Sequence, residues 1–245
     1  MDKIFLLALV ITFVAYFVKG FSGFGPALIL IPSFTLLYNP VTAIAYSTIF
    51  DAIAGILLLV LVIKNIDWKF ILPIILLMFA GAYFGVMFIT RIPVQTLKLL
   101  IGIVLVLFII ILLSEREDRF TFVKNTQKSF VYGMAFLAGF IGGITGITGP
   151  ILVIIFKLKF EREAFRSQLI AIFTMGALWR LYLYYSHQLI PEFKAEFIYM
   201  VIIVLIALGI GHLFQNNMDE KRFNRYISFI LIIPAVNLFI DVLKS

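Results

Sequence analysis

The sequence predicts an all-α, polytopic transmembrane protein built from two pseudo-symmetric repeats. Three observations predict this fold class: an extreme apolar composition, eight apolar blocks joined by short polar connections, and a glycine-rich break that occurs twice. Each repeat is expected to hold four apolar blocks and to start with a broken, re-entrant helix. The expected division is 1–113 for the first transmembrane repeat, 114–128 for a connecting loop and 129–245 for the second repeat.

The composition excludes a soluble globular domain. Of the 245 residues, 63% are hydrophobic and 13% are charged, whereas soluble domains average about 45–50% and about 25%. A chain of this size has too little interior to bury 27 Phe together with its aliphatic residues, so much of its surface must face lipid. The absence of Cys excludes thiol chemistry. The net charge of +7 comes from short loops without long basic runs, which argues against a nucleic-acid partner.

Most of the eight apolar blocks are long enough to cross the roughly 30 Å hydrocarbon core of a bilayer as helices. They comprise residues 4–38 with an internal break, 42–63, 70–90, 97–113, 129–156 with an internal break, 168–186, 197–213 and 226–242. The longest polar connection, 114–128, is too short to form a soluble domain. The function is therefore expected inside the membrane part.

Two motifs recur at nearly the same offset and indicate an internal duplication. The segment Gly20-Phe-Ser-Gly-Phe-Gly-Pro26 is similar to Gly143-Ile-Thr-Gly-Ile-Thr-Gly-Pro150, with an offset of 123 (143 minus 20) at the first glycine. Gly85 and Gly211, each followed by a polar loop, are separated by 126 (211 minus 85). Half of the chain is about 122 residues, so the pattern favours two repeats, as in many secondary transporters.

The basic residues favour an inverted relation between the repeats. If each broken block crosses the membrane once, nine basic residues fall on each side, against the positive-inside rule. If each broken block turns back, fourteen share one side, five lie on the other, and Arg180 lies in the membrane. Both termini are then outside and loop 114–128 is cytoplasmic. The fourteen are Lys19, Lys64, Lys69, Arg116, Arg119, Lys124, Lys128, Lys157, Lys159, Arg162, Arg166, Lys221, Arg222 and Arg225.

Each glycine-rich break is expected to contribute to an anion-binding site. A helix break frees backbone groups that lipid cannot satisfy, so it is tolerated only next to protein or water. The helices that resume after the breaks would direct N–H groups and positive dipole ends toward a cavity. The alternative role of the small residues is close helix packing, but the repetition favours a substrate-binding site. The candidate residues are Gly20, Ser22, Gly23, Gly25 and Pro26, with Gly143, Thr145, Gly146, Thr148, Gly149 and Pro150.

Asp51 is the candidate for proton coupling. It is the tenth of the 22 residues in block 42–63, near the bilayer centre, where a charge costs about 2.5–3.5 kcal/mol. Ser47, Asp51 and Gly55 share one small, polar helix face. Asp51 would accept a proton because burial favours the neutral form of a carboxyl group. A structural ion pair or a hydrogen-bonded, protonated acid is the equal alternative.

Arg180, the thirteenth of the 19 residues in block 168–186, is the candidate anion ligand. Its guanidinium could bind an oxyanion through two hydrogen bonds or pair with Asp51, and extension to the membrane surface is the alternative. Arg166 is a weaker candidate, because segment 157–166 carries charges of both signs and is interpreted as a solvated loop. No His, Asp or Glu residues have metal-ligand spacing, and no metal site or cofactor is expected.

These motifs resemble those of a known family. The segment 20–32 followed by 43–48, and the segment 142–150 followed by Arg166-Ser-Gln, are similar to the TauE/SafE sulfite exporter family of membrane transporters, over nearly the whole chain. The resemblance implies a permease for sulfite, sulfoacetate or other sulfonates. We therefore expect a secondary active transporter, not an enzyme, that moves a small anion by alternating access. It would be a multi-pass protein of the cell membrane, specifically the cytoplasmic membrane of a bacterium.

Two other functions are compatible with parts of the sequence. The segment Gly20-Phe-Ser22-Gly23 is similar to the GxSG motif of rhomboid-type intramembrane proteases, with His212 as a distant base. Against this interpretation, the second repeat has Thr145 in place of Ser22. A single catalytic Ser–His dyad also gives no reason for the motif to occur twice. A non-transporting assembly or sensor protein is the third class, and it predicts no solute flux.

Overall fold

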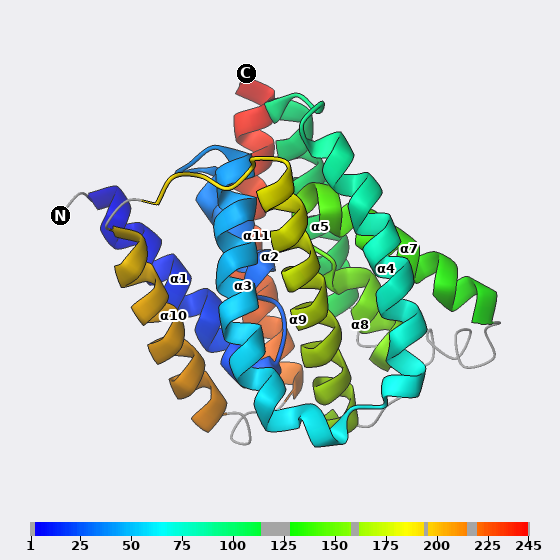
Figure 1. The fold of residues 1–245 in the computed structure, drawn as a ribbon. Helices are drawn as coiled ribbons and strands as arrows, with labels where there is room; N and C mark the ends of the chain where they lie inside the picture. Colours follow the sequence, from blue (N-terminus) through cyan, green and yellow to red (C-terminus); the bar gives the residue numbers. More distant parts are fainter. Residues whose placement is uncertain (1–2, 114–127, 158–161, 194–195, 215–219, 245) are drawn as a thin grey trace.

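The computed structural model describes residues 3–113, 128–157, 162–193, 196–214 and 220–244. These residues are largely α-helical, and no strand is found among them (Figure 1). The helices are α1 (Lys3–Ser22), α2 (Pro26–Thr35), α3 (Pro40–Val62), α4 (Trp68–Ile89), α5 (Val94–Leu113), α7 (Lys128–Thr145), α8 (Gly149–Lys157), α9 (Arg162–Ser186), α10 (Glu196–Leu213) and α11 (Glu220–Lys244), with a 3₁₀ turn η1 (Ile63–Asn65) after α3.

Each predicted apolar block forms a helix, and the two broken blocks form the helix pairs α1/α2 and α7/α8. The prediction is wrong at α9, which begins at Arg162 rather than at residue 168. Arg166 therefore lies in a helix and not in a solvated loop, because its side chain finds partners in neighbouring helices. Of the predicted connecting loop 114–128, residues 114–127 lie outside the described part of the chain.

The helices have the length and surface of a multi-pass membrane protein. Among the described residues, five helical segments are long and apolar enough to span a bilayer: Lys3–Ser22, Pro40–Asn65, Trp68–Ile89, Val94–Ile111 and Glu196–Leu213. Large apolar side chains lie on the outside, with Val60 68%, Ile198 62% and Phe229 62% exposed. Such a surface is suited to lipid rather than water.

Helix starts follow ordinary capping chemistry. Pro26 and Pro40 stand at the first positions of α2 and α3, where the missing N–H costs nothing. The Asn39 side chain accepts a hydrogen bond from the Val41 amide at 2.9 Å, and Asp67 accepts one from the Phe70 amide at 3.2 Å. The bounds of α2, α3 and α4 are therefore set locally.

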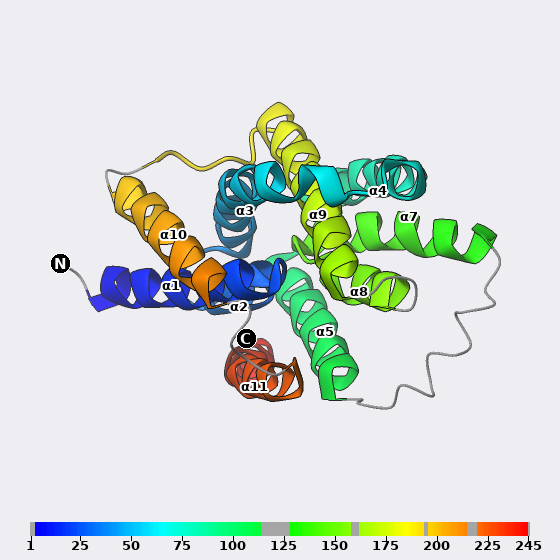
Figure 2. The same cartoon turned by 90° about the horizontal axis from the view of Figure 1, so that it is seen from below.

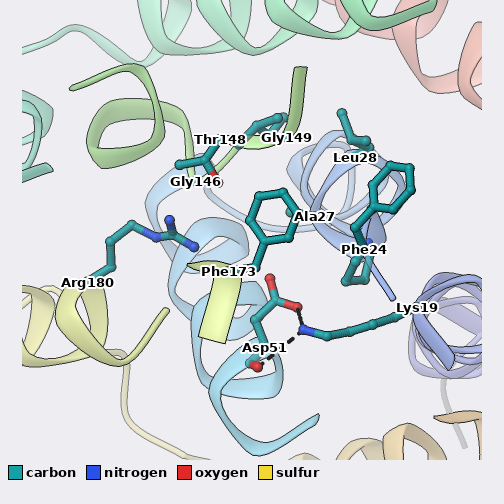
Figure 3. Close-up of a pocket in the computed structure, with 13 residues that line it drawn as sticks. Lys19, Phe24, Ala27, Leu28, Asp51, Gly146, Thr148, Gly149, Phe173 and Arg180 are labelled. Atoms are coloured by element: carbon teal, nitrogen blue, oxygen red, sulfur yellow. Dashed lines mark hydrogen bonds and ion pairs between the residues drawn. The ribbon is translucent and has the colours of Figure 1, made fainter. Parts of the chain in front are cut away.

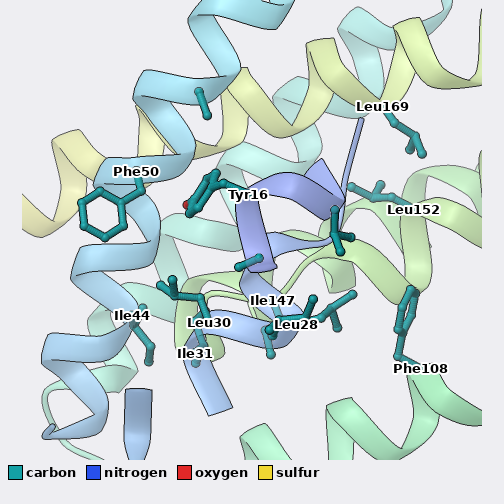
Figure 4. Packing of buried hydrophobic residues seen from close by; sticks show 14 of the residues in the cluster. Tyr16, Leu28, Leu30, Ile31, Ile44, Phe50, Phe108, Ile147, Leu152 and Leu169 are labelled. Atoms are coloured by element: carbon teal, nitrogen blue, oxygen red, sulfur yellow. The ribbon is translucent and has the colours of Figure 1, made fainter. Parts of the chain in front are cut away.

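Viewed from below, α3 and α9 lie between a pair formed by α1 and α10 and a pair formed by α4 and α7, with α5 and α11 along one side (Figure 2). The chain descends along α1 and returns upward along α2, while both termini lie toward the upper end of the bundle in Figure 1. Apolar side chains from α1, α2, α3, α5, α8 and α9 pack around the two helix breaks (Figure 4).

Glycines allow the outer helix pairs to pack backbone against backbone. A Cβ atom on Gly20 of α1 would lie 2.3 Å from the Leu208 carbonyl oxygen of α10, and one on Gly211 would lie 2.1 Å from that of Phe17. Between α4 and α7, a Cβ on Gly85 would lie 2.3 Å from the Phe140 oxygen. Association of helices in lipid depends on such close packing.

We predict that Gly139→Ala destabilises the protein, because its Cβ would lie 2.0 Å from the Met78 carbonyl oxygen. Overpacking of this kind costs about 1–3 kcal/mol, which should lower the melting temperature of the detergent-purified protein. Gly133→Ala in the same helix is the matched control, since nothing lies within 4 Å of its Cβ position. Equal melting temperatures of the two variants would contradict the close contact between α4 and α7.

Candidate functional site

The two helix breaks meet at one partly open cavity. The first break contributes Phe24, Gly25 and Pro26, together with the start of α2, and the second contributes residues 146–149. Side chains from α1, α3 and α9 complete the lining (Figure 3). The cavity volume is about 30 Å³, which is room for about two water molecules.

Glycines at the breaks adopt backbone angles that other residues rarely reach. The φ angles are +84° at Gly23, +92° at Gly25 and +76° at Gly146. A side chain costs about 1–2 kcal/mol in this left-handed region, so glycine is the residue that turns the chain out of α1 and α7.

The hydrogen bonds freed by the first break are replaced by side chains. In an uninterrupted helix the Gly20 carbonyl would accept from the Phe24 amide. Instead, Arg166 Nη2 donates to the Gly20 oxygen at 3.0 Å, and the Phe24 amide donates to Ser22 Oγ at 3.2 Å. The first break is thus satisfied by protein groups, as a break at membrane depth requires.

The second break repeats this arrangement at matched positions. Tyr184 donates from its hydroxyl to the Gly143 oxygen at 3.2 Å, and the Ile147 amide donates to Thr145 Oγ1 at 3.2 Å. Ser22 Oγ and Thr145 Oγ1 also donate to carbonyl oxygens one turn back, those of Val18 and Ile141, at 2.8 Å each. The two hydroxyls therefore bond to the backbone of their own breaks.

The structure divides the predicted site residues into two groups. Those that line the cavity are Gly25, Pro26, Gly146, Thr148, Gly149, Asp51 and Arg180. Those outside the lining are Gly20 and Gly143, which pack against α10 and α4, Gly23, which contacts Arg166, Ser22 and Thr145, which bond to backbone, and Pro150. The glycine-rich motif thus combines residues of three kinds: those that allow close packing of helices, those that turn the chain and those that line the cavity.

Arg180 brings a buried cationic group to the cavity. Its side chain reaches in from α9 (Figure 3) and only 4% of the residue is exposed. Its Nε atom is buried without a hydrogen-bond partner, and no ion pair of Arg180 is found among the described residues. A buried charge without a partner is costly; the expectation that Arg180 binds an anion stays a prediction.

Asp51 faces the same cavity as part of an ion pair with Lys19. Lys19 Nζ lies 2.8 Å from Asp51 Oδ1 and 3.2 Å from the Asp51 carbonyl oxygen. The Tyr16 hydroxyl donates to Asp51 Oδ1 at 3.2 Å. Lys19, counted above among the fourteen basic residues of one side, lies in the last turn of α1 and is 3% exposed, so it is not a surface charge.

Sequence reasoning did not find the Lys19–Asp51 pair. The two residues are 32 positions apart, and no periodic pattern connects α1 to α3. The only available signal was the presence of two opposite charges in apolar blocks, since charges at membrane depth usually have partners.

Arg166 and His212 lie beside the first break rather than in the cavity. Arg166 Nη2 is 3.4 Å from His212 Nδ1, in addition to its bond to Gly20. Ser22 Oγ lies 2.8 Å from the carbonyl oxygens of both Val18 and Phe24, either of which can accept its single hydrogen. No contact between Ser22 and His212 is found in the described part of the chain, so the geometry gives the protease alternative no support. The described residues also hold no cluster of three potential metal ligands.

Helices of membrane-spanning length, with two helix breaks that line one cavity, are the features of a multi-pass membrane protein. The family "Sulfite exporter TauE/SafE" matches residues 8–238, nearly the whole chain. The chain belongs to this family. Neither the curated proteins nor the solved structures that were searched contain a match to the chain.

We predict that Gly146→Ala destabilises the protein, because its φ of +76° disfavours a side chain and its Cβ would lie 2.5 Å from Ile31 Cδ1. Gly149→Ala, in the same break, is the matched control: its nearest neighbour would be Leu28 Cδ1 at 3.9 Å. The melting temperature in detergent should fall for the first variant and stay near that of the wild type for the second. A similar melting temperature for both would show that Gly146 is not required for the turn.

Proposed function

We propose that this protein is a secondary active transporter that moves small oxyanions, of the sulfite or organosulfonate type, by alternating access. The observation that carries the proposal is the buried guanidinium of Arg180, which faces a cavity between two helix breaks and has an unpartnered Nε. Membership of the TauE/SafE family supports the same class of substrate. The protein would act in the cytoplasmic membrane of a bacterium, with the small anion and the lipid bilayer as its partners.

The cavity has the donors that an oxyanion requires. Arginine presents a planar set of N–H groups that matches two oxygens of one anion. The helices α2 and α8, of 10 and 9 residues, begin at the cavity and add the positive ends of their dipoles. The other predicted residues in the lining would form the surface around the anion: Gly25, Pro26, Gly146, Thr148 and Gly149.

Two inverted repeats would supply the alternating movement. In the two repeats, α1 to α5 correspond in order to α7 to α11. Under this correspondence the contact of α1 with α10 is equivalent to that of α7 with α4, and the structure contains both contacts. The central contact of α3 with α9 and the contact of α5 with α11 each map onto themselves. These pairings support a pseudo-twofold relation, in which each half can rock against the other around a fixed site.

Asp51 would couple this movement to protons. Protonation would remove the negative charge that holds Lys19 Nζ at 2.8 Å. Because this pair joins α1 to α3, its loss would let the two helices move relative to one another, so proton binding would be linked to the conformational change. Because no nucleotide-binding motif occurs in the sequence, an ion gradient is the proposed source of energy.

We predict that Arg180→Gln lowers anion uptake by about tenfold to a hundredfold, since a hydrogen bond to a charged group contributes about 1.5–3 kcal/mol. The measurement is uptake of labelled sulfite, sulfonates and short carboxylates by proteoliposomes. Arg91→Gln is the matched control, because Arg91 is exposed between α4 and α5. Uptake of none of these anions by the wild type would contradict the transporter proposal, and full uptake by Arg180→Gln would remove Arg180 from the site.

The inverted arrangement makes a separate prediction about sidedness. Asn39 and Glu192 are exposed in the loops after α2 and α9, and both should lie outside, whereas Asn65 should face the cytoplasm. Because the chain has no Cys, the variants Asn39→Cys, Glu192→Cys and Asn65→Cys can be labelled singly with an impermeant maleimide in intact cells. Labelling of the first two, with Asn65→Cys labelled only after permeabilisation, is expected. If each broken block crossed once, Asn39→Cys and Glu192→Cys would lie on opposite sides.

A further inference from the structure

The ionisable side chains around the cavity are unevenly balanced. Among the described residues that line it, α1 contributes Lys19, α3 contributes Asp51 and α9 contributes Arg180. The remaining lining residues, from the two breaks and α2 and including Phe173 of α9, have no ionisable side chains. Two cations and one anion therefore face one small volume.

Lys19 and Asp51 neutralise each other. The ammonium of Lys19 is engaged by both the carboxylate and the carbonyl oxygen of Asp51, at 2.8 and 3.2 Å, and the Tyr16 hydroxyl donates to the same carboxylate oxygen at 3.2 Å. Both ion-pair partners are buried, with side chains 4% and 10% exposed. Water does not screen the pair, so the separation of its charges would be costly.

Arg180 reaches the cavity from α9, on the opposite side of the view in Figure 3 from Lys19, and its guanidinium is not part of the Lys19–Asp51 pair. Its charge has no compensating partner among the described residues. The cavity thus has one uncompensated positive charge while the Lys19–Asp51 pair is intact. A singly charged anion beside Arg180 would make the site neutral, whereas a dianion would leave a buried negative charge uncompensated.

We propose that the Lys19–Asp51 pair sets the charge selectivity of the site, so that it accepts singly charged oxyanions and rejects dianions of the same size. This inference rests on the proposed transport function and narrows its substrate class. Asp51 acts here as a specificity-determining residue: by holding Lys19, it keeps a second cation away from the anion. The proposed selectivity is one of charge, because anions of the same size but different charge would be distinguished.

Methanesulfonate and sulfate provide the direct test. Both are tetrahedral and similar in size, but one carries one charge and the other two. In proteoliposomes at neutral pH, the wild type is expected to take up labelled methanesulfonate at least tenfold faster than labelled sulfate. Equal rates, or faster sulfate uptake, would overturn the inference and leave the transport function intact. Uptake of no anion at all would overturn the transport function as well.

Charge-changing variants test the role of the pair itself. Asp51→Asn frees Lys19 and should lower the ratio of methanesulfonate to sulfate uptake at least tenfold. Lys19→Gln leaves the Asp51 carboxylate to cancel Arg180, so uptake of both anions should fall at least tenfold. The double variant Lys19→Gln with Asp51→Asn restores the original charge balance and should recover the preference for methanesulfonate. An unchanged ratio in folded Asp51→Asn, or no recovery in a folded double variant, would overturn the inference.

A second ion pair provides a matched control. Lys98 of α5 is paired with Asp241 of α11, away from the cavity lining. Lys98→Gln removes a lysine from a pair of the same type and should leave the ratio unchanged. A ratio altered to the same extent as in Asp51→Asn would show that the effect comes from general destabilisation. Melting temperatures in detergent identify variants that do not fold. The ratio of methanesulfonate to sulfate uptake by the wild type tests the charge selectivity independently of any variant.

Discussion

Lipid offers no hydrogen bonds to a polypeptide, and the rest of the structure depends on this constraint. Intact helices satisfy it through their own backbones. The two broken helices satisfy it with protein groups: Arg166 and Tyr184 bind the carbonyl oxygens of Gly20 and Gly143. Both of these side chains come from α9. One helix therefore stabilises both breaks, and the same helix presents Arg180 to the cavity between them.

Buried charges, like buried hydrogen-bonding groups, must be compensated by other protein groups because lipid cannot compensate them. Lys19 and Asp51 can be buried because each compensates the other at 2.8 Å, whereas the Nε of Arg180 is left without a hydrogen-bond partner. Among the described residues Arg166 also has a buried Nε without a hydrogen-bond partner, but of the two arginines only Arg180 lines the cavity. A buried cation without an ion pair lowers stability, and such sites are typically functional. The asymmetry between a paired and an unpaired cation is what allows the cavity to distinguish ligands by charge.

Glycine has three separate roles in the repeated motif. Gly20 and Gly143 permit backbone contact with α10 and α4, where a Cβ would meet carbonyl or backbone atoms. Gly23, Gly25 and Gly146 supply left-handed backbone angles. Gly149 faces the cavity at the start of α8. The repeat of the motif thus reflects the repetition of a whole packing arrangement and not only of a binding site.

The sequence by itself determined the class of protein, the helix blocks and the positions of both breaks. These features are local, because apolar runs, Gly and Pro act through the chain's own backbone and its contact with lipid. It also identified Asp51 and Arg180 as unusual, since charges at those depths are costly wherever the helices lie.

Only the tertiary structure decided which of these residues face one another. The Lys19–Asp51 pair joins α1 to α3 across 32 positions, and Arg166 reaches Gly20 across 146. Such contacts depend on how the helices pack, which no periodicity within a single helix encodes. Ser22 and Thr145, in contrast, bond to backbone groups only two to four residues away, because each hydroxyl satisfies groups freed by its own break.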